Sequence, residues 1–162
     1  MIIKVINTIV LCLVVTLTVN AQLLEVDKTE GNTKTQITQE CSIIENENIA
    51  YISFSKVSDN NKTECQLKIS ISSQDGDESY DAGTEFVLHL EDGSEIRITN
   101  LEDVEYEYDM NQFICMINHK LQEEDLKKLQ NNKIVDIKGY NLDGAVDQMA
   151  SLKIQESVRL II

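Results

Sequence analysis

The sequence predicts an α+β fold: a mainly antiparallel β-sheet built from hairpins, followed by two helices late in the chain. Alternating apolar and polar residues run from about residue 49 to residue 117, and such alternation is typical of half-buried strands. Turn-forming residues separate these runs, and helical spacing of apolar residues begins only after residue 121. Strands first and helices late favour an antiparallel sheet over a parallel one with alternating helices.

The alternating runs give about seven strands. "IAYISFSKV" and "ECQLKISIS" flank the polar turn "SDNNKT", and "TEFVLHL" and "EIRITNL" flank Asp92-Gly93. An Asp-Gly pair between two alternating runs is a strong hairpin signal, because glycine supplies the positive φ of a tight turn. "VEYEY" and "NQFICMIN" form a further pair around "DMN", and "KIVDIKGY" adds one more strand.

Two segments have the apolar period of a helix. "LQEEDLKKLQNN" carries Leu126 and Leu129, with acidic residues in its first turn and lysines after them, which is the charge order that the helix dipole favours. "MASLKIQESVRLII" places Ile154, Val158 and Ile161 on one stripe. This second segment is therefore expected to be an amphipathic C-terminal helix packed on the sheet.

Residues 1–21 have the pattern of a secretory signal peptide. Lys4 precedes an apolar run that ends near Val19, and Val19-Asn20-Ala21 supplies the small residues of a cleavage site. The run is too short for a membrane span, which needs about 20 residues; the alternative is an N-terminal anchor helix that is not cleaved. The sequence predicts an exported protein, periplasmic or extracellular, with no transmembrane segment after cleavage.

Residues 22–47 are mostly polar. We expect a partly flexible lead-in here, with one short strand near residues 38–44. A single α+β domain is then expected over residues 48–162, because a chain of this length ordinarily forms one domain.

The acidic composition limits the partners. The chain carries 28 Asp and Glu against 14 Lys and Arg, a formal net charge of −14. Such a chain is repelled by nucleic acids and by anionic membrane surfaces. An acidic surface can bind cations or a basic partner. The alternative interpretation is a surface that is solvated and has no such partner.

The stretch "QDGDESYDAG" contains four acidic residues within ten positions. It departs from the EF-hand pattern, since Tyr80 stands where the turn needs glycine and Phe86 where a bidentate glutamate is needed. An acidic turn between strands is the favoured interpretation. If the turn does hold calcium, its candidate ligands are Asp75, Asp77 and Asp81.

Three cysteines remain after the signal peptide. Cys65 and Cys115 lie in phase with apolar neighbours and are expected to be buried thiols. Cys41 lies in the polar lead-in and is a candidate for a disulfide with Cys65, because export favours oxidation. Zinc would need Cys115, His119 and His89, but these lack the local spacing of zinc ligands, and His89 alternates onto the outer face.

Two tyrosines are candidates for partner binding. Tyr106 and Tyr108 fall on one face of an expected strand, flanked by Glu105 and Glu107. Packing against the core explains this pattern without a partner. The functional alternative is an exposed aromatic strip for a protein or glycan, since aromatic residues are enriched at interfaces.

Two segments carry a resemblance to known proteins. "FVLHLEDGSEIRI" resembles a strand-turn-strand unit of the form I-x-F-x-DG-x-x-I-x-I, and "LQEEDLKKLQNNKIVDIKGY" resembles the helix-strand segment that follows it. Behind a signal peptide, this combination resembles small exported proteins of Bacteroidetes-type bacteria, whose function is unknown. The resemblance supports the fold and the compartment, and it carries no catalytic or binding residue.

The sequence contains no G-x-S-x-G motif and no glycine-rich phosphate loop. We therefore assign no catalytic residue and no cofactor. The function expected from the sequence is that of a non-catalytic binding or structural module with a protein or glycan partner. The alternative is a small extracytoplasmic hydrolase whose carboxylate site the sequence does not reveal.

Overall fold

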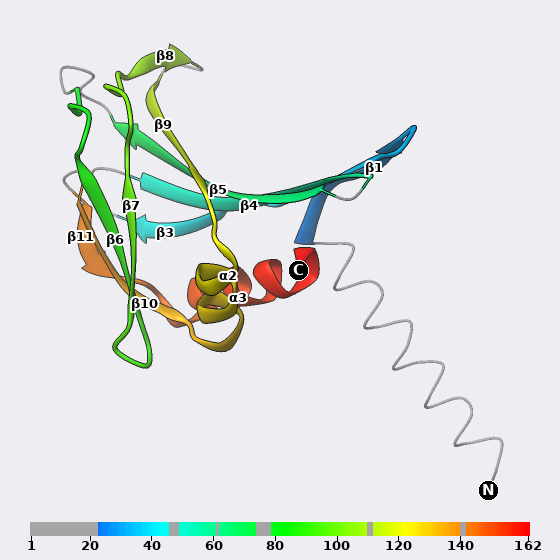
Figure 1. Ribbon diagram of the computed structural model, residues 1–162. Coiled ribbons are helices and arrows are strands. Elements are labelled where there is room, and N and C mark those ends of the chain that lie inside the picture. The colour runs from blue at the N-terminus through cyan, green and yellow to red at the C-terminus, as the bar shows by residue number, and fades with distance from the viewer. Residues whose placement is uncertain (1–22, 46–48, 61, 74–78, 110–111, 140–141) are drawn as a thin grey trace, which may run out of the picture.

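Two antiparallel sheets and two late helices make up the protein (Figure 1). The computed structural model describes residues 23–45, 49–60, 62–73, 79–109, 112–139 and 142–162. Over this part of the chain the larger sheet has seven strands and the smaller sheet has four. The α+β class, the antiparallel pairing and the two late helices predicted from the sequence are confirmed.

The larger sheet has the strand order β1-β2-β4-β5-β9-β8, and β3 also pairs with β4. Its longest strands, β4 and β5, form the hairpin predicted around "SDNNKT", where Asn60 adopts a positive φ of 52°. The strands span Leu24–Glu30 (β1), Thr33–Thr38 (β2), Cys41–Glu45 (β3), Ile49–Asp59 (β4), Lys62–Ser73 (β5), Glu107–Asp109 (β8) and Gln112–Lys120 (β9).

The smaller sheet has the order β11-β10-β6-β7. Its β6–β7 hairpin turns at the predicted Asp-Gly pair, and Gly93 has the positive φ of 82° that this turn requires. The strands are Glu85–Leu90 (β6), Glu95–Thr99 (β7), Ile134–Gly139 (β10) and Leu142–Ala145 (β11). Because β10 joins β6 from much later in the chain, this sheet combines two hairpins that are separate in sequence.

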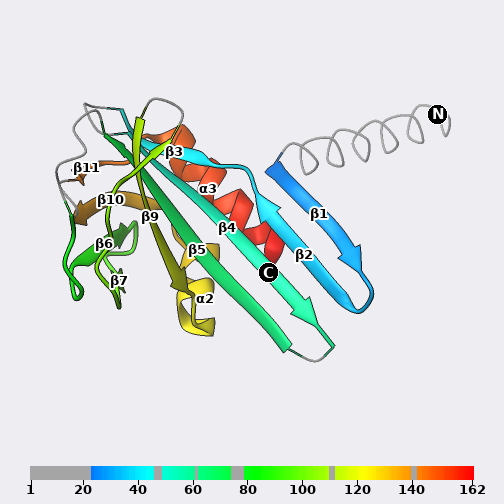
Figure 2. The same ribbon diagram turned by 90° about the horizontal axis from the view of Figure 1, so that it is seen from above.

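The helices are α2, Glu123–Asn131, and α3, Gln148–Ile161. Asp147 caps α3 by accepting hydrogen bonds from the Met149 and Ala150 amides at 2.8 and 3.2 Å. Helix α3 lies along one face of the larger sheet, against β2, β3 and β4, and also contacts α2 and β10 (Figure 2). Its predicted apolar stripe, Ile154, Val158 and Ile161, is buried.

One hydrophobic core joins both sheets and both helices. The larger sheet contributes the inward side chains of β4, β5 and β9, and the smaller sheet contributes those of β6, β7 and β10. Fully buried examples are Phe54, Leu67, Ile69, Phe86, Leu88, Ile96 and Ile137. Because this core is shared, the described residues form a single domain.

The N-terminal boundary of the domain was predicted wrongly. Residues 24–45 are not a lead-in with one short strand, because they form β1, β2 and β3 of the larger sheet. The hairpin of β1 and β2 extends beyond the helices as an arm (Figure 2). Most residues of β1 are exposed and most of β2 are half-buried, but the residues of both strands are mainly polar, so they lack the long apolar alternation that predicts a strand. Residues 1–21, the expected signal peptide, lie outside the described residues.

Candidate binding groove

A groove of about 930 Å³ opens between β7 of the smaller sheet and β9 of the larger sheet. It is lined by the end of β7, by residues 100–107 that lead to β8, and by β9 from Ile114 to Lys120. We call this feature the β7–β9 groove. Its volume lies within the range of about 300–1,000 Å³ that is usual for ligand pockets.

One side of the groove is the open edge of β7. This strand pairs with β6, and no described strand pairs with its other side. Ser94 and Asn100 bond backbone to backbone with the β6 side, at Leu90 and Thr84. Since bonded and non-bonded residues alternate along an antiparallel strand, the backbone N–H and C=O groups of Arg97 and Thr99 point away from β6. Both residues line the groove.

The opposite side is the open part of β9. Strand β8 pairs with β9 only as far as Ile114, so residues 115–120 have no second strand partner among the described residues. The Leu121 N–H bonds to the Cys65 carbonyl of β5 at 3.0 Å. By the same alternation, the backbone groups of Met116, Asn118 and Lys120 point away from β5. The groove thus lies between two open strand edges.

Asn100 fixes the segment that closes one end of the groove. Its side chain is 7% exposed, and its Nδ2 donates to the backbone carbonyls of Asp81 and Glu102, each at 2.9 Å. A longer contact of 3.4 Å reaches the Tyr80 carbonyl. The Asn100 Oδ1 is buried and has no donor among the described residues. Asn100 therefore holds residues 101–107 against the 80–84 segment.

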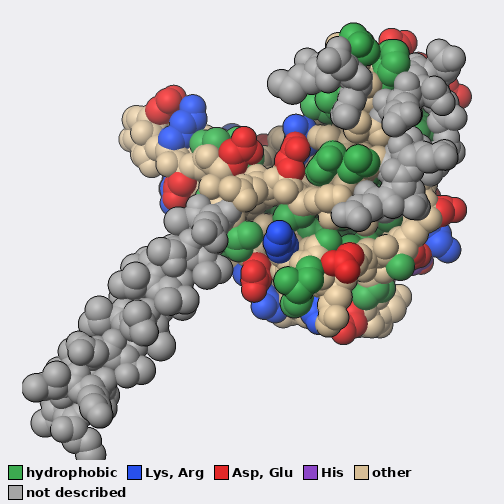
Figure 3. Space-filling view, turned by 180° about the vertical axis from the view of Figure 1, so that it is seen from behind, with side chains coloured by type: hydrophobic (Ala, Val, Ile, Leu, Met, Phe, Trp, Pro, Cys, Tyr) green, Lys and Arg blue, Asp and Glu red, His purple; other side chains and the backbone are tan. Residues whose placement is uncertain are grey.

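The groove exposes two large apolar side chains. Leu101 is 91% exposed and Met116 is 46% exposed. Both line the groove, together with the partly buried Val104 and Ile114. On the face shown in Figure 3, hydrophobic side chains form small groups among charged and other side chains.

The charge of the groove is unbalanced. Four carboxylates line it, those of Glu102, Asp103, Glu105 and Glu107. No ion pair involves any of them within the described part of the chain, although Asp103 accepts the Ala82 N–H at 2.7 Å.

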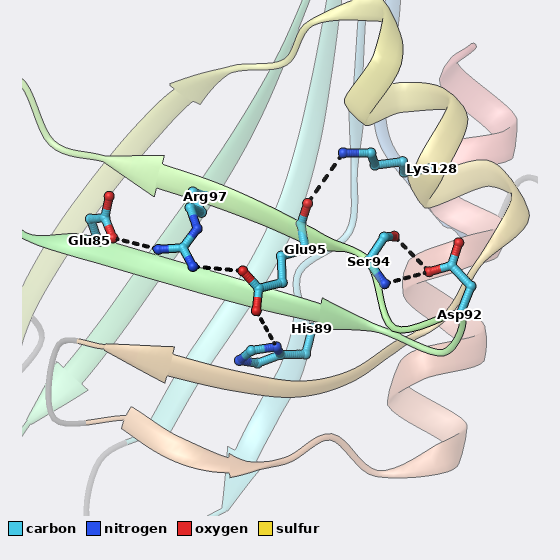
Figure 4. A network of polar contacts seen from close by, with 7 residues as sticks. All are labelled: Glu85, His89, Asp92, Ser94, Glu95, Arg97 and Lys128. Carbon is cyan, nitrogen blue, oxygen red and sulfur yellow. Dashed lines mark hydrogen bonds and ion pairs between the residues drawn. The ribbon is translucent and has the colours of Figure 1, made fainter.

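The basic groups of the groove are already paired. The Lys120 Nζ lies 3.3 Å from Glu64 of β5, a residue outside the groove. The Arg97 guanidinium lies 3.0 Å from Glu85 and 2.8 Å from Glu95 on the outer face of the smaller sheet (Figure 4). Both cations thus have carboxylate partners beyond the groove, which leaves its own carboxylates as an excess of negative charge.

Contacts of Glu95 occupy the other end of the β7 edge. Lys128 of α2 donates to the Glu95 carbonyl at 3.3 Å (Figure 4). Glu95 also lies 3.3 Å from the Nδ1 of His89, whose Nε2 is buried without a partner among the described residues. His89 is on the outer face, as predicted. The open part of β7 is therefore the end that lines the groove.

The residues predicted as calcium ligands are described only in part. Asp75 and Asp77 lie outside the described residues. Asp81 is exposed, and its backbone carbonyl accepts from the Thr84 amide at 3.1 Å and the Thr84 hydroxyl at 2.8 Å. Within the described part of the chain, no three His, Cys, Asp or Glu side chains come together in a way that could hold a metal ion.

The three cysteines among the described residues, Cys41, Cys65 and Cys115, are buried and free, and the structure does not support the Cys41–Cys65 disulfide. Cys41 pairs with Ile52, which pairs with Ile69 of β5. Cys65 lies four residues along β5 from Ile69, about 13 Å at 3.3 Å per residue, whereas a disulfide needs Cα atoms within about 7 Å. Burial raises the pKa of all three thiols, that of Cys115 to about 11.

The two candidate tyrosines have different surroundings. Tyr106 is half-buried outside β8, lines the groove, and has its hydroxyl 3.2 Å from that of Tyr80. Tyr108 is 65% exposed and its ring lies 5.2 Å from that of Phe113 across the β8–β9 pair. Of the two, the groove involves Tyr106.

The sequence did not single out the residues that build the groove. Leu101, Asn100 and Met116 belong to no motif, and Glu105 and Glu107 were noted only as neighbours of the tyrosines. The available signal was the acidic segment "NLEDVEYEY", which runs from the end of the predicted strand "EIRITNL" through the predicted strand "VEYEY". What makes this segment a site is the meeting of two sheet edges, which local patterns do not specify.

No described helix combines the length and the apolar character that a membrane span requires. A second hollow, of about 620 Å³, lies over the tips of β4 and β5 and is lined mostly by polar and charged side chains. The chain matches no protein-family model, no curated protein and no solved structure at a significant level.

Proposed function

We propose that this protein is a non-catalytic binding module that holds an extended segment of a protein partner in the β7–β9 groove. The observation that carries the proposal is the pair of open strand edges lining one groove. Unpaired backbone groups at a sheet edge readily accept an additional strand. The signal-peptide pattern of residues 1–21 supports the further proposal that the protein binds its partner outside the cytoplasm, in the periplasm or beyond it.

The chemistry of the described carboxylates weighs against the alternative of a hydrolase. A general acid at neutral pH needs a raised pKa, usually from burial. Where a carboxylate pKa is displaced here, at Glu64, Asp92 and Glu123, it is lowered by hydrogen bonds at the surface, chiefly those from Gln66, Ser94 and Lys127 respectively. These groups are suited to structural roles.

A display library of random 12-residue peptides tests the proposal. Selection on the wild-type protein is followed by comparison with Met116→Glu, which places a charge on the open β9 edge, next to the end of β8. Met149→Glu is the matched control, because Met149 is 64% exposed on α3 and lies outside the groove. We expect enriched peptides that bind the wild type and Met149→Glu but not Met116→Glu. Peptides that bind all three proteins equally would contradict the proposal.

A further inference from the structure

We infer that the segment recognised by the groove is basic, and that it binds as an added β-strand on the open edge of β9. This inference rests on the proposed function and specifies its partner. The strand edge determines the conformation of the segment, and the unpaired carboxylates determine its charge.

The conformation follows from the geometry of β9. From Met116 to Lys120 the open edge spans about 13 Å at 3.3 Å per residue. Backbone groups of Met116, Asn118 and Lys120 point outward over this length, and β8 already pairs with the same edge at Ile114. A partner strand placed here would continue the line of β8, so the larger sheet needs no rearrangement to accept it.

The charge follows from the lining. Glu102, Asp103, Glu105 and Glu107 have no ion-pair partner among the described residues, whereas Lys120 and Arg97 are paired with carboxylates outside the groove. An acidic segment would meet only repulsion from these carboxylates. A segment with alternating Lys and apolar residues would place cations near them and apolar groups near Leu101 and Met116.

The test uses a blocked nine-residue peptide of alternating Lys and Val, and the same peptide with Glu in place of Lys. Binding to the full-length exported protein is measured by isothermal titration calorimetry at low and at physiological salt. We expect the Lys peptide to bind and the Glu peptide not to bind. Binding should weaken by about tenfold at the higher salt concentration, because exposed charges are screened within about 10 Å.

Two further variants separate groove binding from general attraction to an acidic protein. Glu105→Gln with Glu107→Gln removes two groove charges, and Glu25→Gln with Glu156→Gln removes two exposed charges elsewhere. We expect the groove pair to weaken binding by about four- to twenty-five-fold, at roughly two- to fivefold per carboxylate, and the control pair to change it little. Equal weakening by both pairs would overturn the inference.

Strand addition is tested with N-methylated peptides, which leave the protein unchanged. Methylation of every second amide removes the donors along one edge of the peptide, and the two possible sets are compared. We expect one set to abolish binding. Unchanged binding by both peptides would overturn strand addition, and a wild-type dimer that Met116→Glu dissociates would make a second copy the occupant. Groove-dependent library peptides without basic residues would refute this inference while leaving the proposed function intact.

Discussion

Gly139 is expected to be the least replaceable of the described glycines. It lies at the end of β10 with a φ of +111°, a conformation that L-residues rarely adopt. A Cβ built on it would lie 2.2 Å from the Glu85 carbonyl oxygen and 3.1 Å from the Phe86 Cα. These are backbone atoms of β6, so no side-chain rotation relieves the contact, and the β6–β10 pair would have to separate.

The expected cost of Gly139→Ala has two parts. Positive φ costs an L-residue about 1–2 kcal/mol. Forcing a methyl group into packed backbone costs about 1–3 kcal/mol more. Gly93→Ala is the matched control, because Gly93 also has a positive φ, +82°, but has no atom within 4 Å of its added Cβ. The free energy of unfolding of Gly93→Ala should therefore fall only by the cost of the positive φ.

Urea unfolding followed by circular dichroism measures both variants, since the chain contains no tryptophan. We expect Gly139→Ala to lower the free energy of unfolding by about 2–5 kcal/mol and Gly93→Ala by about 1–2 kcal/mol. The m-value should stay constant if both variants unfold in two states. A difference between the variants below about 0.5 kcal/mol, the size of an ordinary surface effect, would refute the reasoning from the Glu85 contact.

Three further predictions concern side chains in the core and at α3. Cys115, with its pKa raised to about 11 by burial, should resist iodoacetamide at pH 8 in the native protein and react in urea; rapid native labelling would contradict its burial. Burial lowers the pKa of His119, with Asp125 opposing the shift. The His119 imidazole therefore takes up a proton at a higher pH in the unfolded state than in the folded state. The free energy of unfolding should consequently decline through His119 as the pH falls below about 6.5. Urea unfolding at pH 7.5 and 5.5 should show a smaller decline for His119→Gln, and an equal decline would be contrary evidence. Asp147→Ala removes the α3 cap and should cost about 1 kcal/mol by urea unfolding, whereas Gln148→Ala should be nearly neutral.

The sequence predicted the elements that bury one face. Strands β4, β5, β6, β7 and β9 alternate because one side of each packs on the core. Both helices were predicted for the same reason, since α3 buries an apolar stripe and α2 packs Leu126 and Leu129 against the core. The Asp92-Gly93 turn was recognisable because its conformation depends on a single residue type.

The elements missed by the sequence analysis are those with no buried stripe to mark them. Strands β1 and β2 form an arm of mainly polar residues, and their turn is the pair Gly31-Asn32, with Gly31 at a φ of +61°. A Gly-Asn pair is a recognised hairpin signal, but the residues on either side of it are mainly polar and did not predict strands. Strand β11 is only four residues long and is buried mainly through Leu142.

The candidate site was harder to predict than the fold because it depends on tertiary arrangement. The acidic and apolar residues of the groove come from β7, from the 100–107 segment and from β9. They meet because the chain leaves the smaller sheet at Thr99 and joins the larger sheet at Glu107. Local spacing does not encode which strand edges remain open after both sheets have formed.

The path of the chain between the two sheets also has a kinetic consequence. The smaller sheet begins with β6 and β7, and the chain then returns to the larger sheet for β8 and β9 before it supplies β10. The pairs Leu88–Ile137 and Leu90–Ile134 between β6 and β10 therefore cannot form until β10 is present. Such distant pairings slow folding. A chain lengthening from its N-terminus keeps one edge of β6 open until β10 has been made, and that interval is when its aggregation and its dependence on chaperones should be greatest.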